Sequence, residues 1–324
     1  MISRRTSLAI MLAAPALAQA QARRPLRLIV PFPPGGGVDS LGRLLAERLA
    51  PLLDQQVVVE NRSGGGGLIG ADAVAKGPAD GTIMGIIGAA TLCAAPVLQT
   101  SMPFDVARDF RFVSQITDSA VLLGVGEAVA AARGWGDMAA LLAWARANPG
   151  RFSVAHAGSG TVTHLTLSAL SRAAGVELNM IPYRGGAQAA TDMIAGTIEG
   201  SADLPATLVP QAAAGRVRLL GTSSATRLGF LPLVPAFAET AGLSGIDIRS
   251  WNMLLVPAVT PVAEAARLQA AVAEVGRDAG FAAALRPFGY DTVVSASLEA
   301  AAALVAAETP RWRALVESSG ARAT

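Results

Sequence analysis

Short apolar runs alternate with longer amphipathic, alanine-rich stretches along most of the chain, and glycine or proline stands at nearly every junction. Runs with strand character lie at residues 26–31, 56–60, 82–87, 110–126, 152–155, 178–182, 217–222 and 250–256. Stretches with helical character lie at residues 38–52, 67–76, 136–147, 162–174, 187–195, 206–214, 262–279, 281–288 and 297–317. This alternation is typical of βαβ units. The sequence therefore predicts an α/β fold with mostly parallel sheets.

Two apolar runs are too long for ordinary strands. Residues 110–126 could form two segments of a chain that crosses from one domain to another, and residues 246–261 could carry the chain back. The first predicted domain is then split into residues 23–123 and 250–324, around a continuous second domain at residues 124–249. Two α/β lobes joined by two crossing strands would enclose a ligand cleft.

The N-terminal residues 1–22 have the pattern of a bacterial export signal. Arg4 and Arg5 precede an apolar run from Leu8 to Leu17, and small residues that suit cleavage follow. The run is shorter than the about 20 residues that a membrane-spanning helix needs. We therefore predict a cleaved signal peptide and a periplasmic location. The paired arginines resemble a twin-arginine signal, so the secretory and twin-arginine routes both stay open.

Charge and cysteine content narrow the choice of partners. The chain has 26 Lys and Arg against 24 Asp and Glu. Because two arginines lie in the predicted signal, the exported chain is formally neutral. It has no basic patch, so nucleic acid is not expected as a partner. Cys93 is the single cysteine, and its apolar surroundings predict a buried small residue rather than a nucleophile.

Glycine-rich corners are the most distinctive feature of the chain. They occur at residues 33–39, 61–67, 155–165 and 182–192, each between a predicted strand and a predicted helix. Glycine lets a ligand approach backbone N–H groups, and a helix N-terminus adds unsatisfied donors and a positive dipole. Such corners suit a carboxylate or phosphate. Alternatively, the glycines only permit tight turns, and Asp39 caps its own helix.

Other chemistry has little support. Residues 65–70 match G-x-G-x-x-G, but no acid follows about 20 residues later to bind a ribose, and there is no P-loop. The two histidines, His156 and His164, have no metal-ligand spacing with other residues. A hydrolase that uses Ser159 and His164 would lack an orienting acid in the local motif. We therefore expect no cofactor, no metal and no enzyme activity.

Many segments together resemble the Bug-type receptors, the extracytoplasmic solute-binding proteins of tripartite tricarboxylate transporters. The resemblance covers essentially the whole exported chain. It is carried by residues 24–49, 57–81, 147–165, 181–196, 212–227, 231–242, 250–251 and 256–261. It implies a type II periplasmic-binding-protein fold, in which two α/β lobes close on a small carboxylate. Hinging would then occur near residues 122–126 and 248–254.

The resemblance also implies a set of ligand-binding residues. They are Gly35, Gly36, Gly37, Asp39, Ala90, Thr91, Ser159, Gly160, Thr161, His164, Gly185 and Asp203. Gly36, Gly37, Gly160 and Thr161 would donate amide or hydroxyl hydrogen bonds to the anion. Asp39 would cap its helix or accept a bond from the ligand, and Asp203 would select at the far end of the ligand.

This chain departs from the family pattern at several positions near the supposed cleft. Ala202 and Leu204 flank Asp203 where the family often has Phe and Asn, and His156 replaces a small residue. Asn252 and Met253 follow Trp251, and the family commonly has a glycine at the second of these two positions. Ala95 replaces a frequent Asn. The ligand of a relative therefore does not transfer directly to this chain.

The leading hypothesis is a monomeric periplasmic receptor that captures a carboxylate and delivers it to the membrane permease subunits of a tripartite tricarboxylate transporter. The alternative is a ligand-sensing partner of a membrane sensor kinase, with the same fold and ligand class.

Overall fold

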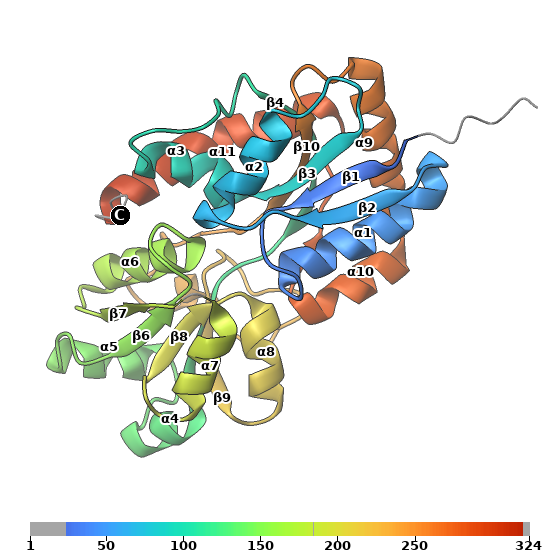
Figure 1. The fold of residues 1–324 in the computed structure, drawn as a ribbon. Helices are drawn as coiled ribbons and strands as arrows, with labels where there is room; N and C mark the ends of the chain where they lie inside the picture. Colours follow the sequence, from blue (N-terminus) through green and yellow to red (C-terminus); the bar gives the residue numbers. More distant parts are fainter. Residues whose placement is uncertain (1–23, 184, 320–324) are drawn as a thin grey trace, which may run out of the picture.

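The computed structural model describes residues 24–183 and 185–319, so the predicted export signal lies outside the described residues. The described residues form two lobes, each built on one β-sheet (Figure 1). The sheet of the first lobe has six strands in the order β11-β4-β10-β3-β1-β2. The sheet of the second lobe has five, in the order β7-β6-β8-β5-β9. The predicted two-lobed α/β fold is confirmed.

The first lobe takes its elements from both ends of the chain. Its strands are β1 (Leu26–Val30), β2 (Val57–Asn61), β3 (Ile83–Gly88), β4 (Phe110–Asp118), β10 (Asn252–Pro257) and β11 (Asp291–Thr292). Its helices are α1 (Gly37–Leu53), α2 (Leu68–Ala75), α3 (Ala95–Leu98), α9 (Val262–Arg277), α10 (Ala279–Leu285) and α11 (Leu298–Ser319). A π-helical turn, η2 (Ala90–Ala94), leads into α3.

The second lobe is continuous in sequence. Its strands are β5 (Leu122–Gly126), β6 (Ser153–His156), β7 (Asn179–Pro182), β8 (Gly200–Asp203) and β9 (Val217–Thr222). Its helices are α4 (Glu127–Arg133), α5 (Met138–Ala147), α6 (Val162–Ala174), α7 (Gly186–Ile194) and α8 (Pro205–Ala213).

Both sheets are mixed, so the prediction of mostly parallel sheets was wrong. β1 pairs in parallel with β2 and β3, and β6 pairs in parallel with β7 and β8. β10 runs antiparallel to β3 and β4, and β5 runs antiparallel to β8 and β9. The short β11 is also antiparallel to β4. Hydrophobic patterning specifies which face of a strand is buried but not the direction of its neighbour.

The strands β5 and β10 show how the lobes face each other. β5 begins at Leu122, which pairs with Asp203 and Thr222 at the carboxyl ends of β8 and β9. β10 begins at Asn252, which pairs with Gly88 at the carboxyl end of β3. A strand that enters a sheet at the carboxyl ends of its neighbours must run antiparallel to those neighbours, as β5 does beside β8 and β10 does beside β3. The carboxyl edges of the two sheets therefore face each other, and the βα corners of both lobes lie where the lobes meet.

The two crossing segments lie side by side. Ala120 forms an isolated antiparallel bridge with Arg249, and the amide of Ser250 donates to the carbonyl of Ser119 at 2.8 Å. The guanidinium of Arg249 also pairs with Asp118. The predicted division of residues 110–126 into two segments is confirmed, because β4 and β5 are separate strands. The extents of the two domains stay a prediction.

One strand of the second lobe, β8, was missed because its residues have little strand character. It consists of Gly200, Ser201, Ala202 and Asp203, all buried. A Cβ on Gly200 would lie 2.6 Å from the ring of Phe152, so the packing of β8 requires a small residue there. Tertiary packing overrides local propensity at this position.

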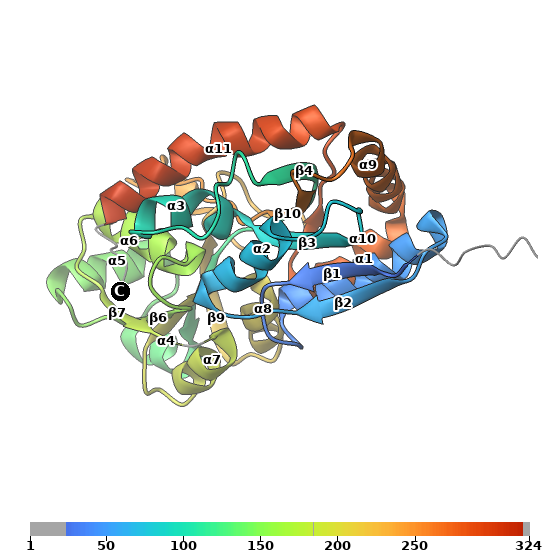
Figure 2. The same ribbon diagram turned by 45° about the horizontal axis from the view of Figure 1, so that its top comes forward.

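Helix α11 extends from the first lobe to the second. It packs against η2 and β4, and its C-terminal end packs against α6 (Figure 2). Among the helices in the described part of the chain, none is long and apolar enough to span a membrane.

Candidate functional site

The first glycine corner, residues 33–39, is held in place by Asp39. The Oδ2 atom of Asp39 accepts a hydrogen bond from the amide of Gly35 at 2.9 Å, and its Oδ1 atom accepts one from Asn61 at 2.8 Å. Arg43 donates to the same carboxylate at 3.0 Å. Burial would raise the pKa of Asp39, but the bonds from Arg43, Gly35 and Asn61 hold that pKa below its ordinary value.

The expectation that Asp39 caps its helix was wrong in detail. The N-cap of α1 is Gly36, which has no side-chain cap, and Asp39 lies within the first turn. The carboxylate instead bonds the loop residue before the N-cap. Because the Asp39 carboxylate already accepts hydrogen bonds from three groups within the first lobe, its role is to position the corner. The amides of Gly36 and Gly37 have no acceptor among the described residues.

The second corner and the loop after β3 pack together beside the first corner. The hydroxyl of Thr91 donates to the carbonyl of Gly66 at 2.9 Å. A Cβ on Gly67 would lie 2.7 Å from the Oγ1 atom of Thr91 and 3.6 Å from the Cβ of Pro31. Gly67 has a φ of 99°, which favours glycine. Ala90 begins η2. Ala90 and Thr91 therefore lie at the carboxyl edge, and the Thr91 hydroxyl proton is engaged within the lobe.

The second lobe presents its own corner, residues 155–165, at the N-terminus of α6. Thr161 is the N-cap, and its hydroxyl donates to the carbonyl of Gly158 at 2.7 Å and accepts from the amide of His164 at 3.4 Å. The Thr161 amide also donates to the Gly158 carbonyl. Ser159 is exposed and has no hydrogen-bond partner in residues 24–183 and 185–319. The amide and the hydroxyl of Thr161 therefore both donate within the corner, whereas the amide and the hydroxyl of Ser159 have no acceptor there.

Two histidines pack against this corner. The rings of His156 and His164 stack, with centroids 4.6 Å apart and an angle of 28° between their planes. The amide of Gly158 donates to Nδ1 of His156 at 3.2 Å, and the amide of Gly160 donates to Nδ1 of His164 at 3.1 Å. Burial, followed by the nearby His164, lowers the pKa of His156 to about 4, and burial lowers the pKa of His164. Both imidazoles are therefore neutral at pH 7.

Asp203 lies at the carboxyl end of β8 and is 8% exposed. Its Oδ1 atom accepts from the amide of Leu204 at 2.7 Å. Burial raises its pKa to about 6, although hydrogen bonds from Leu204 and Thr207 act in the opposite direction. A Cβ on Gly186 would overlap the Asp203 carboxylate, whereas the predicted site residue Gly185 has open space around its Cβ position. Gly186 is therefore the glycine of this corner that Asp203 requires.

A cluster from the first lobe lies near Asp203 and was not predicted. Tyr290 is fully buried, and a Cβ on Gly37 would lie 3.1 Å from its hydroxyl oxygen. Burial raises the pKa of Tyr290 to about 12, with a hydrogen bond to Asn252 lowering it and the charge of Asp203 raising it. The side-chain amide of Asn252 donates to Thr117 at 3.0 Å. Tyr290 thus lies between the N-terminus of α1, the start of β10 and the opposite lobe.

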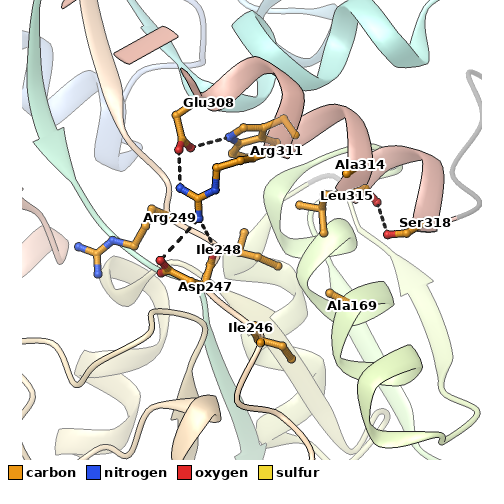
Figure 3. A pocket seen from close by; sticks show the side chains of 12 residues that line it. Ala169, Ile246, Asp247, Ile248, Arg249, Glu308, Arg311, Ala314, Leu315 and Ser318 are labelled. Atoms are coloured by element: carbon orange, nitrogen blue, oxygen red, sulfur yellow. Dashed lines mark hydrogen bonds and ion pairs between the residues drawn. The ribbon is translucent and has the colours of Figure 1, made fainter. Parts of the chain in front are cut away.

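A separate cavity of about 460 Å³ lies where the returning crossing segment meets α6 and α11 (Figure 3). None of the predicted ligand-binding residues lines it. Its edge is formed by Glu308, which accepts from Arg311 at 2.6 Å and from Trp312 at 3.2 Å. The Nε1 atom of Trp251 donates to the same carboxylate at 3.4 Å. This network joins α11 to the crossing segment and is structural.

The arrangement is suited to binding rather than to catalysis. No hydrogen bond joins Ser159 to His164, because His164 Nδ1 is taken by Gly160. Within the described ranges, no group of three or more His, Cys, Asp or Glu could hold a metal ion. Cys93 is buried, as predicted, and burial raises its pKa to about 12, so it is not a reactive thiol.

Two α/β lobes with opposed carboxyl edges and glycine corners define the class of two-lobed solute-binding proteins. The sequence profile described as the tripartite tricarboxylate transporter family receptor matches residues 41–321, and the chain belongs to this family. The predicted family is confirmed, and its members are solute-binding receptors rather than enzymes.

Relatives and solved structures agree with this assignment. The chain is 38% identical over 294 residues to a UPF0065 protein from the tcbD-tcbE intergenic region of Pseudomonas sp. strain P51, covering 90% of this chain and 85% of the relative. It is 31% identical over 312 residues to BugT of Bordetella pertussis, covering 96% and 94%. The structure of Rpa4515 from R. palustris with adipate aligns with a TM-score of 0.85 at 30% identity, covering 93% and 99%. MatC from Rhodopseudomonas palustris with bound malate aligns with a TM-score of 0.79 at 28% identity, covering 91% and 99%.

Proposed function

We propose that this chain is an exported receptor that captures a small carboxylate between its two lobes and delivers it to a tripartite tricarboxylate-type permease. The observation that carries the proposal is the opposition of two carboxyl edges, each with a helix N-terminus. Helix α1, of 17 residues, and helix α6, of 13 residues, begin at glycine corners of opposite lobes. Helix N-termini attract anions through their free amides and their dipoles.

The free donors indicate how the anion is held. Gly36 and Gly37 contribute amides from the first lobe, and Ser159 contributes an amide and a hydroxyl from the second. Adipate and malate, which are bound in two solved relatives, are both dicarboxylates. Two opposed helix N-termini suit a ligand with a carboxylate at each end. Asp203 lies beside the second-lobe corners and selects among ligands by accepting or donating a hydrogen bond.

The test is a thermal-shift screen of the tag-free exported chain, stripped of ligand by unfolding and refolding. The panel contains mono-, di- and tricarboxylates, with adipate and malate included, and phosphate as a different anion. Binding to the native state raises the apparent melting temperature by mass action, equivalent to about 2.7 kcal/mol at a hundredfold excess over Kd. We expect a shift with at least one carboxylate. The absence of any shift in a folded, empty protein would contradict the proposal.

A matched pair of glycine variants tests the position of the site. A Cβ on Gly36 meets only the carbonyl of Pro33 at 3.8 Å, so we expect Gly36→Val to fold. Gly229 is exposed with open space around its Cβ position, so Gly229→Val is the control. We expect the ligand-dependent shift to be lost in Gly36→Val and kept in Gly229→Val. Equal shifts in the two variants would remove the first corner from the site.

Export and delivery need their own tests. N-terminal sequencing of the periplasmic protein should place the mature start near residue 23, and Arg4→Lys with Arg5→Lys should block export only if the twin-arginine route is used. Light scattering of the purified protein should give the mass of a monomer. Uptake of the identified carboxylate in cells should require both the receptor and the permease subunits.

A further inference from the structure

We propose that the Nε2–H groups of His156 and His164, and not the amide of Gly160, join the amide and hydroxyl of Ser159 as the donors that the second-lobe corner offers to a ligand carboxylate. This inference rests on the proposed function and assigns the anion-binding atoms of that site. His156 was a departure from the family pattern without an assigned role, and Gly160 was the expected donor.

The hydrogen bonds of the corner fix the tautomer of both rings. An imidazole nitrogen that accepts an N–H bond carries no proton, so the proton of a neutral ring lies on the other nitrogen. Both Nδ1 atoms accept backbone amides, from Gly158 and from Gly160. Both Nε2 atoms must therefore be the donors. The amides of Gly158 and Gly160 are therefore not available to an anion, because each donates to a histidine ring. Each ring offers an Nε2–H donor in place of the amide that it accepts.

The rings also turn these donors away from the corner. Both Nδ1 atoms face amides of the same short loop, and the ring planes are within 28° of each other. The Nε2 edges therefore lie on the side opposite the loop. No described residue accepts from either Nε2, and neither atom is among the buried polar atoms that lack a partner. The two donors therefore reach the molecular surface without an acceptor.

The surroundings of His156 explain why a large ring fits there. His156 ends β6 at the carboxyl edge, and the register pairs Ala155 with Ser201, which places His156 beside Ala202. The small Ala202 leaves room for an imidazole that is 4% exposed. Two neutral N–H donors on adjacent stacked rings suit the two oxygens of one carboxylate, because hydrogen bonds to an ionised acceptor are stronger than bonds between neutral groups.

The first experiment uses the fact that the chain has only two histidines. Tag-free protein labelled with ¹⁵N-histidine should show, for both rings, a protonated Nε2 and an unprotonated Nδ1. Adding the carboxylate with the largest thermal shift in the panel should move both Nε2–H resonances and slow their exchange with water. Resonances that stay in place while the same carboxylate raises the melting temperature would overturn the inference and leave the proposed function intact.

The second experiment measures affinity by calorimetry in His156→Phe, which keeps a stacked ring and removes both nitrogens. Loss of a hydrogen bond to a charged group corresponds to about a tenfold weaker Kd. Ser171→Ala, in α6 but outside the corner, is the control and should bind as the wild type does. Binding within twofold of wild type in a folded His156→Phe would overturn the inference. No binding of any carboxylate by the wild-type protein would overturn the proposed function and the inference together.

Discussion

Gly289 of the first lobe lies directly against Pro205 of the second, so closely that a Cβ on Gly289 would overlap the ring of Pro205. Gly289 has a φ of 73°, which favours glycine. Its carbonyl accepts a buried hydrogen bond from Ser119 at 2.6 Å, in the first crossing segment. Gly289 therefore contacts both the second lobe, through Pro205, and the first crossing segment, through Ser119.

We expect Gly289→Ala to hold the lobes apart and to weaken carboxylate binding by at least about tenfold, since about 1.4 kcal/mol of lost contact has that effect. Small-angle scattering should show a larger radius of gyration in the variant. Gly134→Ala is the control, because Gly134 has a φ of 71° and open space around its Cβ position. It should carry only the backbone penalty of about 1–2 kcal/mol. Equal affinity in the two variants would show that the Gly289 contact does not control closure.

Glu308 is the second contact that we expect to matter for the join between the lobes. Its buried carboxylate accepts from the indoles of Trp251 and Trp312 and from Arg311. Glu308→Ala leaves two indole N–H groups without an acceptor, which should lower the free energy of unfolding by about 3 kcal/mol in urea denaturation. Glu308→Gln keeps one acceptor and should lose less. The control is Glu317→Ala at an exposed position, which should change the free energy of unfolding by under about 0.5 kcal/mol. A change in Glu308→Ala as small as that of the control would contradict the prediction.

The sequence predicted the parts of this fold that depend on local patterns. The corner at residues 33–39 was identifiable because its glycines lie between a buried strand and an amphipathic helix. The division of residues 110–126 was identifiable because its apolar run exceeds the length of a strand. Strand β8 was missed because Gly200 is required by the ring of Phe152, a contact that local propensity does not report.

The chemistry of the site was harder to predict because it depends on where side chains point. The contact of Tyr290 with Gly37 joins residues far apart in the sequence, and no local motif announces it. The amide of Gly160 was expected to face a ligand, yet it donates to His164. Whether an amide is free depends on a rotamer that sequence does not specify. Local motifs therefore located the corners without showing which of their donors remain free.

The raised pKa of Asp203 predicts a stability that depends on pH. Its folded pKa of about 6 lies above the unfolded value of about 3.9. The folded state therefore binds more protons between pH 4 and pH 6, so this residue makes the free energy of unfolding fall as the pH rises through that range. This shift of about two pKa units corresponds to a change of about 3 kcal/mol in the free energy of unfolding.

Asp203→Asn keeps an oxygen that can accept from Leu204 and removes the titration. The variant should gain stability relative to wild type as the pH rises from 4 to 7, measured by urea denaturation at each pH. The exposed Glu317→Gln controls for the loss of one negative charge. A constant difference between Asp203→Asn and wild type across this range would show that Asp203 titrates normally in the folded protein.

His156 predicts the opposite slope in an overlapping range. Its folded pKa of about 4 lies below the unfolded value of about 6.5. The unfolded state therefore binds more protons between pH 6.5 and pH 4, and the contribution of His156 to stability is lost as the pH falls through that range. The loss amounts to about 3 kcal/mol. In the wild-type protein it opposes the contribution of Asp203 between pH 4 and pH 6.

His156→Phe should therefore resist acid better than wild type, with its relative stability rising by about 3 kcal/mol from pH 7 to pH 4. Urea denaturation over this range measures the difference, and Asp203→Asn provides the contrast because its relative stability should change with the opposite sign. In the double variant the two changes should largely cancel, since both titrations are gone. A His156→Phe curve parallel to that of wild type would mean that the His156 imidazole is protonated in the folded protein as readily as in water.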